Sequence, residues 1–281
     1  MVLLLSKNFY LILGGSLRLK IKLYAKDNKI IPYNYQYQFS SALYLLLKFG
    51  STEFSEFLHN QGYKLNGKPY KLFSFAVQFE QFTSQKNYIT LESPYLYLYV
   101  SSPIVDEFIK NFVVGTFERT FFYFSSGGNE IKFLINNMEL LPQPDFETET
   151  KFKLLSPLVL STVKEYNGKL SPYYLRPEDK VDINRILTNN LLNKYELVNN
   201  RKTDGKVELE WDENYLRKHP RITKKVTINE HGRNPVDVVG LVAPFKLKGD
   251  KELMKIGYEC GFGEKNSMGF GMAEVINNQK E

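Results

Sequence analysis

Three side chains in the first quarter of the chain are of types that can transfer protons or bind phosphate. Tyr44 falls on the polar side of a predicted helix, so its hydroxyl is expected to be free, and a surface tyrosine without a role is the alternative. His59 lies in the last turn of a second predicted helix, three residues before Gly62. The helix dipole favours a protonated imidazole there, which suits a proton donor near neutral pH, and a helix-capping histidine is the alternative. Lys71 is the first residue of the next predicted strand, and a solvated lysine without a role is the alternative there.

A basic run in the second half of the chain is a candidate phosphate-binding strip. His219 lies among lysines and arginines in NYLRKHPRITKK, and His231 lies in the turn EHGRNP that follows. A run of this density is typical either of a solvated loop or of a strip that binds the phosphates of a nucleic acid. The basic side chains of this run and turn are Arg217, Lys218, Arg221, Lys224, Lys225 and Arg233.

The segment GYECGFGEKNSMGFGMAEV, residues 257–275, contains five glycines within fifteen positions. Glycine favours backbone with positive φ or backbone that another group approaches closely, so this density predicts a structured loop. The loop fits neither common phosphate-binding motif, because GFGEKN lacks the third glycine of the dinucleotide fingerprint and no lysine follows Gly269. Both motifs also need a helix after the loop, whereas MAEVI predicts a short strand.

The composition is that of a globular, basic protein. The 281 residues are 43% hydrophobic and carry a formal charge of +6 with a pI near 9.0, which favours polyanions as partners. One cysteine, Cys260, excludes a disulfide framework and fits a reducing cytosol. No stretch approaches the roughly 20 apolar residues of a membrane helix, and Lys7 and Asn8 interrupt the apolar N-terminal run, which argues against a signal peptide.

The sequence contains no recognisable metal or serine-nucleophile motif. No pair of His, Cys or Asp residues has the spacing of zinc ligands, and no Gly-x-Ser-x-Gly elbow occurs. We therefore expect neither a metal site nor a cofactor.

The elements that position these residues follow one order twice. Alternation of apolar and basic residues in LRLKIKLYA, residues 17–25, predicts a strand with one wet, positive face. The pattern then continues as helix, strand, strand, helix and strand, which is the ferredoxin-like βαββαβ plan. After a joint rich in proline and acid, the same order resumes. In both halves the element order alone indicates the duplication, since the sequences do not repeat.

The predicted class is therefore α+β, with two tandem ferredoxin-like domains at residues 1–143 and 150–281 and a C-terminal glycine-rich loop. Two segments of the second half, KFKLLSPLVLST and VDVVGLVAPFKLKG, each predict one strand. A long amphipathic helix is expected in EDKVDINRILTNNLLNKYELV, and a shorter one in DKELMKIGYECG.

The segment GYECGFGEKNSMGFGMAEV resembles the C-terminal glycine-rich signature of the CRISPR-associated precursor-RNA endoribonucleases, the family numbered six in the RAMP superfamily. The upstream segments IPYNYQYQFSSALYLLLK, FLHNQGY and KLFSFAV resemble that family's N-terminal half in the same order. The similarity covers residues 16–276. The leader before it departs from the family pattern, because relatives usually begin at the first strand.

The resemblance implies metal-independent cleavage of a CRISPR repeat RNA by attack of a ribose 2′-hydroxyl on the adjacent phosphorus. Tyr44, His59 and Lys71 match the Tyr, His, Lys set that some members use for catalysis. Tyr44 and His59 would share the proton transfers, with the base and the acid left open, and Lys71 would stabilise the extra negative charge on phosphorus. The glycine-rich loop would present its amides and tip to a phosphodiester. The expected RNA-binding residues are Lys20, Lys22, the six basic residues named above, Gly261, Gly263, Lys265, Asn266, Ser267, Gly269 and Gly271.

The alternative function is a non-catalytic RAMP subunit that binds CRISPR RNA without cutting it. CRISPR repeat RNA is the expected partner of either protein, with CRISPR effector-complex proteins and a second copy of the chain as further candidates. The expected location is the cytoplasm of a prokaryote, with no membrane association.

Overall fold

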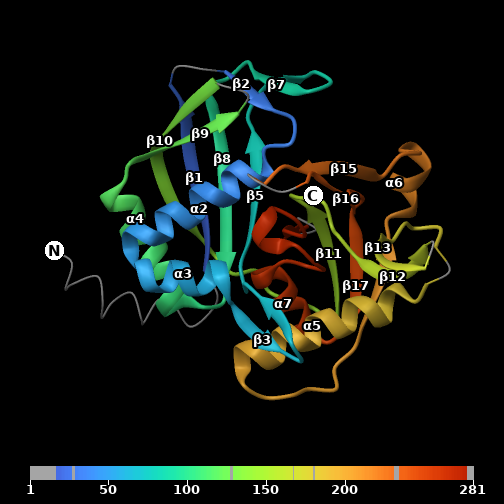
Figure 1. Ribbon diagram of the computed structural model, residues 1–281. Helices are drawn as coiled ribbons and strands as arrows, with labels where there is room; N and C mark the ends of the chain where they lie inside the picture. The colour runs from blue at the N-terminus through green and yellow to red at the C-terminus, as the bar shows by residue number, and fades with distance from the viewer. Residues whose placement is uncertain are drawn as a thin grey trace, which may run out of the picture.

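Two antiparallel sheets stand side by side, each with helices on one face (Figure 1). The strands of the first sheet end at Leu141 and those of the second begin at Glu149. The computed structural model describes residues 17–26, 29–126, 129–166, 168–179, 181–230 and 234–276.

The first sheet has the strand order of a ferredoxin-like domain with one added strand. Its order is β5 (Ser74–Phe79), β8 (Tyr95–Ser102), β1 (Leu17–Ala25), β10 (Asn129–Leu141) and β9 (Phe121–Ser126). Three helices cover one face, namely α2 (Gln36–Gly50), α3 (Thr52–Asn60) and α4 (Lys110–Glu118), with the π-turn η1 (Val105–Ile109) before α4. Leu19, Ile21 and Leu23 of β1 are buried toward these helices, so Lys20 and Lys22 face away from them.

The second sheet repeats the plan without the added strand. Its order is β14 (Val207–Trp211), β17 (Phe245–Gly249), β11 (Glu149–Leu154) and β18 (Ala273–Val275). Helices α5 (Ile183–Asn199) and α7 (Lys251–Cys260) pack on one face and enclose a second core. The predicted pair of ferredoxin-like domains and both predicted helices of this half are confirmed.

Several short elements lie outside the two sheets. Three small ribbons pair β3 (Tyr63–Leu65) with β4 (Lys68–Tyr70), β12 (Ser161–Tyr166) with β13 (Lys169–Tyr174), and β15 (Thr223–Ile228) with β16 (Val236–Leu241). The strands β2 (Ile30–Pro32), β7 (Tyr88–Leu91) and β6 (Phe82–Ser84) form a further small sheet. Helix α6 (Glu213–Lys218) and the single 3-10 turn η2 (Asn266–Met268) complete the described elements.

Two segments that predict single strands are each two strands. VDVVGLVAPFKLKG divides into β16 and β17, which belong to different sheets, and KFKLLSPLVLST divides into β11 and β12. A proline lies between the two strands in each segment, Pro244 between β16 and β17 and Pro157 between β11 and β12. Proline has no amide hydrogen to donate to a neighbouring strand, so the strand pairing is interrupted there.

The expectation that Arg18 belongs to the wet face of β1 is wrong. Its side chain is only 2% exposed and crosses to the second domain. Nη1 donates to the carbonyl of Ala273 at 2.7 Å, Nη2 donates to the carbonyl of Tyr258 at 2.6 Å, and the guanidinium lies 3.6 Å from the centre of the Tyr258 ring. Burial lowers the pKa of Arg18 to about 10. This arginine therefore ties the two domains together and is not available to RNA.

Candidate active site

Tyr44 lies on α2, where its half-buried side chain faces α3 and the glycine-rich loop. Its ring packs edge-on against the imidazole of His59, with ring centres 5.1 Å apart, and against Phe73 at 5.8 Å. Burial raises the pKa of the Tyr44 hydroxyl above its usual range, and a hydrogen bond with the Ser267 side chain opposes that shift. The prediction that the Tyr44 hydroxyl is free at the surface is therefore wrong, because Ser267 of the glycine-rich loop contacts it.

His59 is placed by the two ends of α3. Ser51 is the N-cap of the helix, as the sequence predicts, and its Oγ accepts a hydrogen bond from the amide of Phe54 at 3.2 Å. The last residue of the helix, Asn60, is followed by Gln61 and by Gly62, which has a positive φ of 66° and whose amide donates to the carbonyl of Phe57 at 2.8 Å. The imidazole of His59 in the last turn is exposed.

The imidazole of His59 has one described polar partner on its own helix. Its Nδ1 lies 3.0 Å from Oδ1 of Asn60. An amide oxygen can only accept a hydrogen bond, so this contact places a proton on Nδ1, and in a neutral imidazole Nε2 is then an acceptor.

Lys71 binds the same helix turn that carries His59. Its ammonium donates to the carbonyl of Leu58 and, at 2.8 Å, to that of His59. These are carbonyls at the negative end of the helix dipole, where a cation is stabilising. Partial burial lowers the pKa of Lys71. Lys71 is thus a helix cap beside His59, and β5 begins only at Ser74.

The structure therefore brings Tyr44, His59 and Lys71 together from three separate segments. Tyr44 touches His59 through the rings, and Lys71 touches the His59 backbone. A phenol, an imidazole with one free nitrogen and an ammonium are groups that can give a proton, take a proton and balance a developing negative charge.

The glycine-rich loop has the positive-φ backbone that the sequence predicts. Gly261, Gly263, Gly269 and Gly271 have φ between 67° and 84°. At two of these positions the protein's own backbone also comes very close. A Cβ on Gly263 would lie 2.2 Å from the carbonyl oxygen of Val159, and one on Gly271 would lie 1.9 Å from that of Phe262.

Much of the loop is committed to contacts within the protein. The amide of Phe262 donates to the carbonyl of Gly271 at 2.7 Å, and the amide of Gly271 donates to that of Pro157 at 2.8 Å. The four glycines are buried, whereas Lys265 at the tip is exposed and Ser267 is half-exposed. Binding of RNA by these glycines, Lys265, Asn266 and Ser267 stays a prediction.

The tip of the loop meets α2 directly beside Tyr44. The hydroxyl of Ser40, one helical turn before Tyr44, donates to the carbonyl of Ser267 at 2.8 Å. Its oxygen also lies 3.6 Å from the sulfur of Met268. The candidate active site therefore lies where the C-terminal loop touches the first helix of the N-terminal domain.

Lys20 and Lys22 lie on the other face of the first sheet, away from Tyr44. Lys20 forms an ion pair with Glu139 at 2.8 Å, and this contact raises its pKa. The ammonium of Lys22 lies 4.1 Å from the centre of the Tyr95 ring. If these lysines bind RNA, they do so on a different surface from the catalytic candidates.

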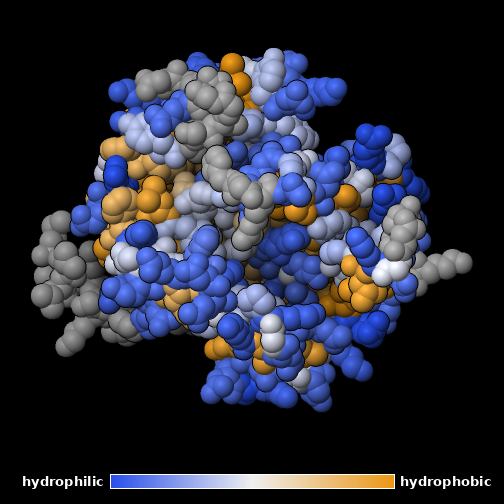
Figure 2. All heavy atoms as spheres, in the orientation of Figure 1, coloured by the Kyte–Doolittle hydropathy of each residue, from blue (hydrophilic) through white to orange (hydrophobic). Residues whose placement is uncertain are grey.

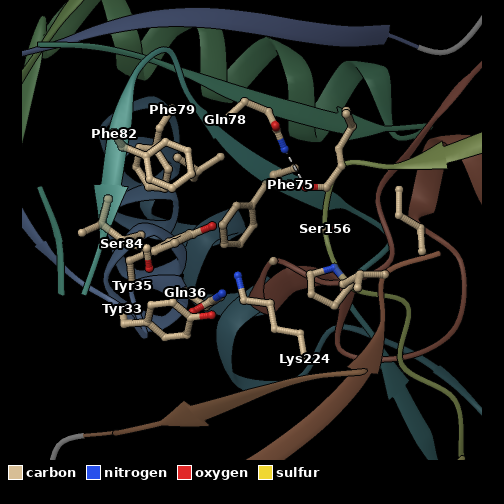
Figure 3. A pocket seen from close by; sticks show the side chains of 18 residues that line it. Tyr33, Tyr35, Gln36, Phe75, Gln78, Phe79, Phe82, Ser84, Ser156 and Lys224 are labelled. Carbon is tan, nitrogen blue, oxygen red and sulfur yellow. Dashed lines mark hydrogen bonds between the residues drawn. The ribbon is translucent and has the colours of Figure 1, made fainter. Parts of the chain in front are cut away.

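The basic strip is divided between several surfaces. Lys225 is exposed and pairs with Asp237 at 3.0 Å, whereas Lys224 on the same strand faces a pocket of about 320 Å³ between the domains. Lys224 points into this pocket near Tyr33 and Gln36 (Figure 3), and burial lowers its pKa. Figure 2 shows hydrophilic side chains gathered in the hollow between the two halves.

The remaining members of the strip lie on or after α6. Arg217 and Lys218 form its last turn, and Arg221 is exposed after it. His219 caps this helix, with Nδ1 3.0 Å from the carbonyl of Tyr215, and stacks on the Tyr215 ring at 4.0 Å. Arg233 and His231 lie outside the described residues.

The described part of the chain contains no cluster of metal-binding side chains and no helix suited to cross a membrane. No group of three or more His, Cys, Asp or Glu side chains there is arranged to hold a metal ion. No helix among the described residues is long and apolar enough to cross a membrane.

Sequence reasoning missed Lys194, which is only 3% exposed on α5. It follows Leu187 and Leu191 on the apolar stripe of that helix, at spacings of seven and three residues. A lysine on a core stripe is a signal that could have singled it out, since lysine is almost never fully buried without partners.

The comparisons with known proteins agree with one another. Residues 141–275 match the family model described as CRISPR associated protein Cas6, C-terminal. A relative from Methanocaldococcus jannaschii, named CRISPR-associated endoribonuclease Cas6 1, is 34% identical over 267 residues, which cover 95% of each chain.

Two solved structures share the whole fold. One, described as CRISPR associated protein Cas6, superposes with a TM-score of 0.71 at 32% identity and covers 94% of this chain and 100% of that one. The other, from a characterization of a Cas6-related gene of Pyrococcus furiosus, has a TM-score of 0.78 at 25% identity with the same coverage.

Proposed function

The chain belongs to the Cas6 family of CRISPR-associated endoribonucleases, and on that premise we propose that it cuts precursor CRISPR RNA within each repeat. The observation that supports this most is the convergence of Tyr44, His59 and Lys71. The rings of Tyr44 and His59 lie 5.1 Å apart, and the Lys71 ammonium binds the carbonyl of His59.

The proposed reaction uses a nucleophile from the substrate. The 2′-oxygen of one nucleotide bonds to the adjacent phosphorus as its proton passes to a base, and the bond from phosphorus to the next 5′-oxygen breaks. That leaving oxygen takes a proton from an acid. The products are a 2′,3′-cyclic phosphate and a 5′-hydroxyl, and no step requires a metal or a cofactor.

We assign the base to Nε2 of His59, in place of the proton donor that its position at the end of the helix suggests from the sequence. The contact between Nδ1 and Asn60 leaves Nε2 unprotonated in the neutral ring. The imidazole is exposed, so a substrate can reach it.

We assign the acid to Tyr44. Burial raises the pKa of this phenol, so the hydroxyl keeps its proton and has one to donate.

Lys71 would stabilise the negative charge that builds on the phosphorane oxygens. An ammonium has three donors, and two of them bind the carbonyls of Leu58 and His59. The third can point to a phosphate held beside His59.

We propose that RNA is held by Lys20 and Lys22 of β1, the basic strip and the loop tip, with Lys224 in the pocket between the domains. Domain limits of 1–143 and 150–281 fit the described strands, which end at Leu141 and resume at Glu149. The reaction would take place in the cytoplasm and supply guide RNA to CRISPR effector proteins.

The experiment that tests this function is a single-turnover cleavage assay on a CRISPR repeat RNA, with a shuffled RNA of the same length as control. Specific cleavage that is lost in His59→Ala supports the enzyme. Tight repeat binding without cleavage would instead support the non-catalytic RAMP subunit. Cleavage that persists at full rate in His59→Ala would overturn the assigned residues.

A further inference from the structure

Lys194 carries a buried charge whose hydrogen bonds all lead to the glycine-rich loop. Its ammonium donates to the carbonyls of Gly261 and Gly263, each at 2.7 Å, and to Oδ1 of Asn266 at 2.8 Å. Burial lowers its pKa to about 8. A buried ammonium is tolerated only when its donors are satisfied, and these three contacts satisfy all of them.

Asn266 passes this restraint to both arms of the loop. Its Nδ2 donates to the carbonyls of Phe262 and Phe270, each at 3.0 Å. The bond from Lys194 to Oδ1 sets the orientation of the amide, so that Nδ2 faces the two carbonyls. Lys194 and Asn266 together form a clamp that fixes the loop's shape.

The next residue after the clamp touches the candidate acid. The carbonyl of Ser267 accepts a hydrogen bond from the hydroxyl of Ser40 at 2.8 Å. The side chain of Ser267 forms a hydrogen bond with Tyr44. Ser40 and Tyr44 lie one turn apart on α2, so a continuous series of contacts leads from the core of the second domain to the phenol of Tyr44.

Helix α5 also supports the segment that carries Lys71. Asn193, adjacent to Lys194, donates to the hydroxyl of Tyr70 at 3.0 Å. Tyr70 ends β4 and directly precedes Lys71. Two consecutive residues of α5 thus contact the two segments that meet at the candidate active site.

We infer that Lys194 is a positioning residue for RNA cleavage, which acts by holding Asn266 so that Ser267 stays against the Tyr44 hydroxyl. The inference rests on the proposed function. Lys194 lies in the second domain and touches no reacting atom, yet it would set the position of Tyr44, the candidate acid in the first domain.

The test compares Lys194→Met with Thr188→Val as the matched control. Methionine has a side chain of similar length to lysine and lacks the ammonium that donates the three hydrogen bonds. Thr188 is buried on the same helix, and its hydroxyl bonds the backbone of Val207 rather than the loop. We expect Lys194→Met to slow single-turnover cleavage about 10- to 100-fold, because a displacement of about 1 Å can cost that much. The RNA dissociation constant should stay within a few fold. Thr188→Val should change neither value.

A second readout follows Tyr44 without using activity. In protein with ¹³C-labelled tyrosine, the Tyr44 ring signal is the one absent from Tyr44→Phe. Lys194→Met and Ser267→Ala should shift this signal in the same direction, and Thr188→Val should leave it in place. If Lys194→Met does not fold, Asn266→Asp provides the same test, since it keeps the acceptor for Lys194 and loses the two donors.

An unchanged Tyr44 signal in the clamp variants and Ser267→Ala would overturn the positioning role. A rate loss in Thr188→Val equal to that in Lys194→Met would also overturn it, since destabilised packing would then explain both. If the wild-type protein does not cleave repeat RNA, the proposed function fails, and the Tyr44 signal still decides whether the clamp sets its position.

Discussion

Removing only the hydroxyl of Tyr44 separates its chemical role from its packing role. In Tyr44→Phe the ring keeps its edge-on contacts with His59 at 5.1 Å and Phe73 at 5.8 Å. The variant loses the hydrogen bond with Ser267 and the proton that we assign to the leaving 5′-oxygen.

The two losses differ in size. One hydrogen bond contributes about 1 kcal/mol to folding, which is small against the roughly 5–15 kcal/mol that stabilises a folded protein. Loss of a general acid lowers a rate by roughly 10²–10⁴. We therefore expect Tyr44→Phe to remain folded and to cleave at least about 100-fold more slowly.

The assay is single-turnover cleavage of end-labelled repeat RNA with enzyme in excess, alongside thermal unfolding and RNA binding. Tyr63→Phe is the matched control, because Tyr63 also packs edge-on against an aromatic ring, Phe57, and donates one hydrogen bond, to Glu107 at 3.0 Å. It should cleave at the wild-type rate. Tyr44→Phe at more than about a third of the wild-type rate would refute the assignment of Tyr44 as the acid.

Three further predictions follow from the same geometry. His59→Ala should lower the single-turnover rate by roughly 10²–10⁴ with RNA affinity within a few fold, whereas Asn60→Ala, which removes only the partner of Nδ1, should cost a few fold; equal losses would contradict the assigned base. Burial lowers the pKa of Lys71, so a cleavage rate that depends on its charge should begin to fall at a pH below the ordinary lysine pKa of about 10.4. Lys71→Arg keeps its charge and should keep the cleavage rate in that pH range. If the rate of Lys71→Arg falls in the same way, loss of the Lys71 proton is excluded as the cause of the fall. In a plot of log affinity against log salt, Lys224→Gln should reduce the slope by about 0.7, whereas Lys225→Gln should reduce it less because Lys225 pairs with Asp237; the reverse order would mean that RNA follows the outer face of β15.

Local signals in the sequence predicted the elements well. The alternation in β1 predicted its buried and exposed faces from Leu19 to Tyr24, and Ser51 and Gly62 predicted the two ends of α3. These signals depend on neighbouring residues only, so they can be read without the fold.

Contacts between distant segments could not be predicted in this way. Arg18 sits in a basic alternating strand, yet its partners Tyr258 and Ala273 are 240 and 255 residues away. Lys71 caps α3 because the ribbon of β3 and β4 returns the chain to that helix. The hydroxyl of Tyr44 meets Ser267 only once the second domain has docked.

The candidate site was predicted in part. Tyr44, His59 and Lys71 were identified from the family resemblance, and the structure brings them together. The clamp of Lys194 and Asn266 was not identified, because the role of a buried lysine depends on which carbonyls surround it.

The most direct test of the account is cleavage of a repeat RNA that carries a single 2′-deoxy nucleotide immediately before the cut. If the 2′-oxygen is the nucleophile, this substrate should bind nearly as well as the all-ribose RNA, since one hydroxyl contributes little to an interface dominated by phosphates. It should not be cut, and the all-ribose RNA should be cut in the presence of EDTA to give a 2′,3′-cyclic phosphate and a 5′-hydroxyl. Cleavage of the deoxy substrate, or a magnesium-dependent 5′-phosphate product, would show that water is the nucleophile and would contradict the roles proposed for Tyr44, His59 and Lys71.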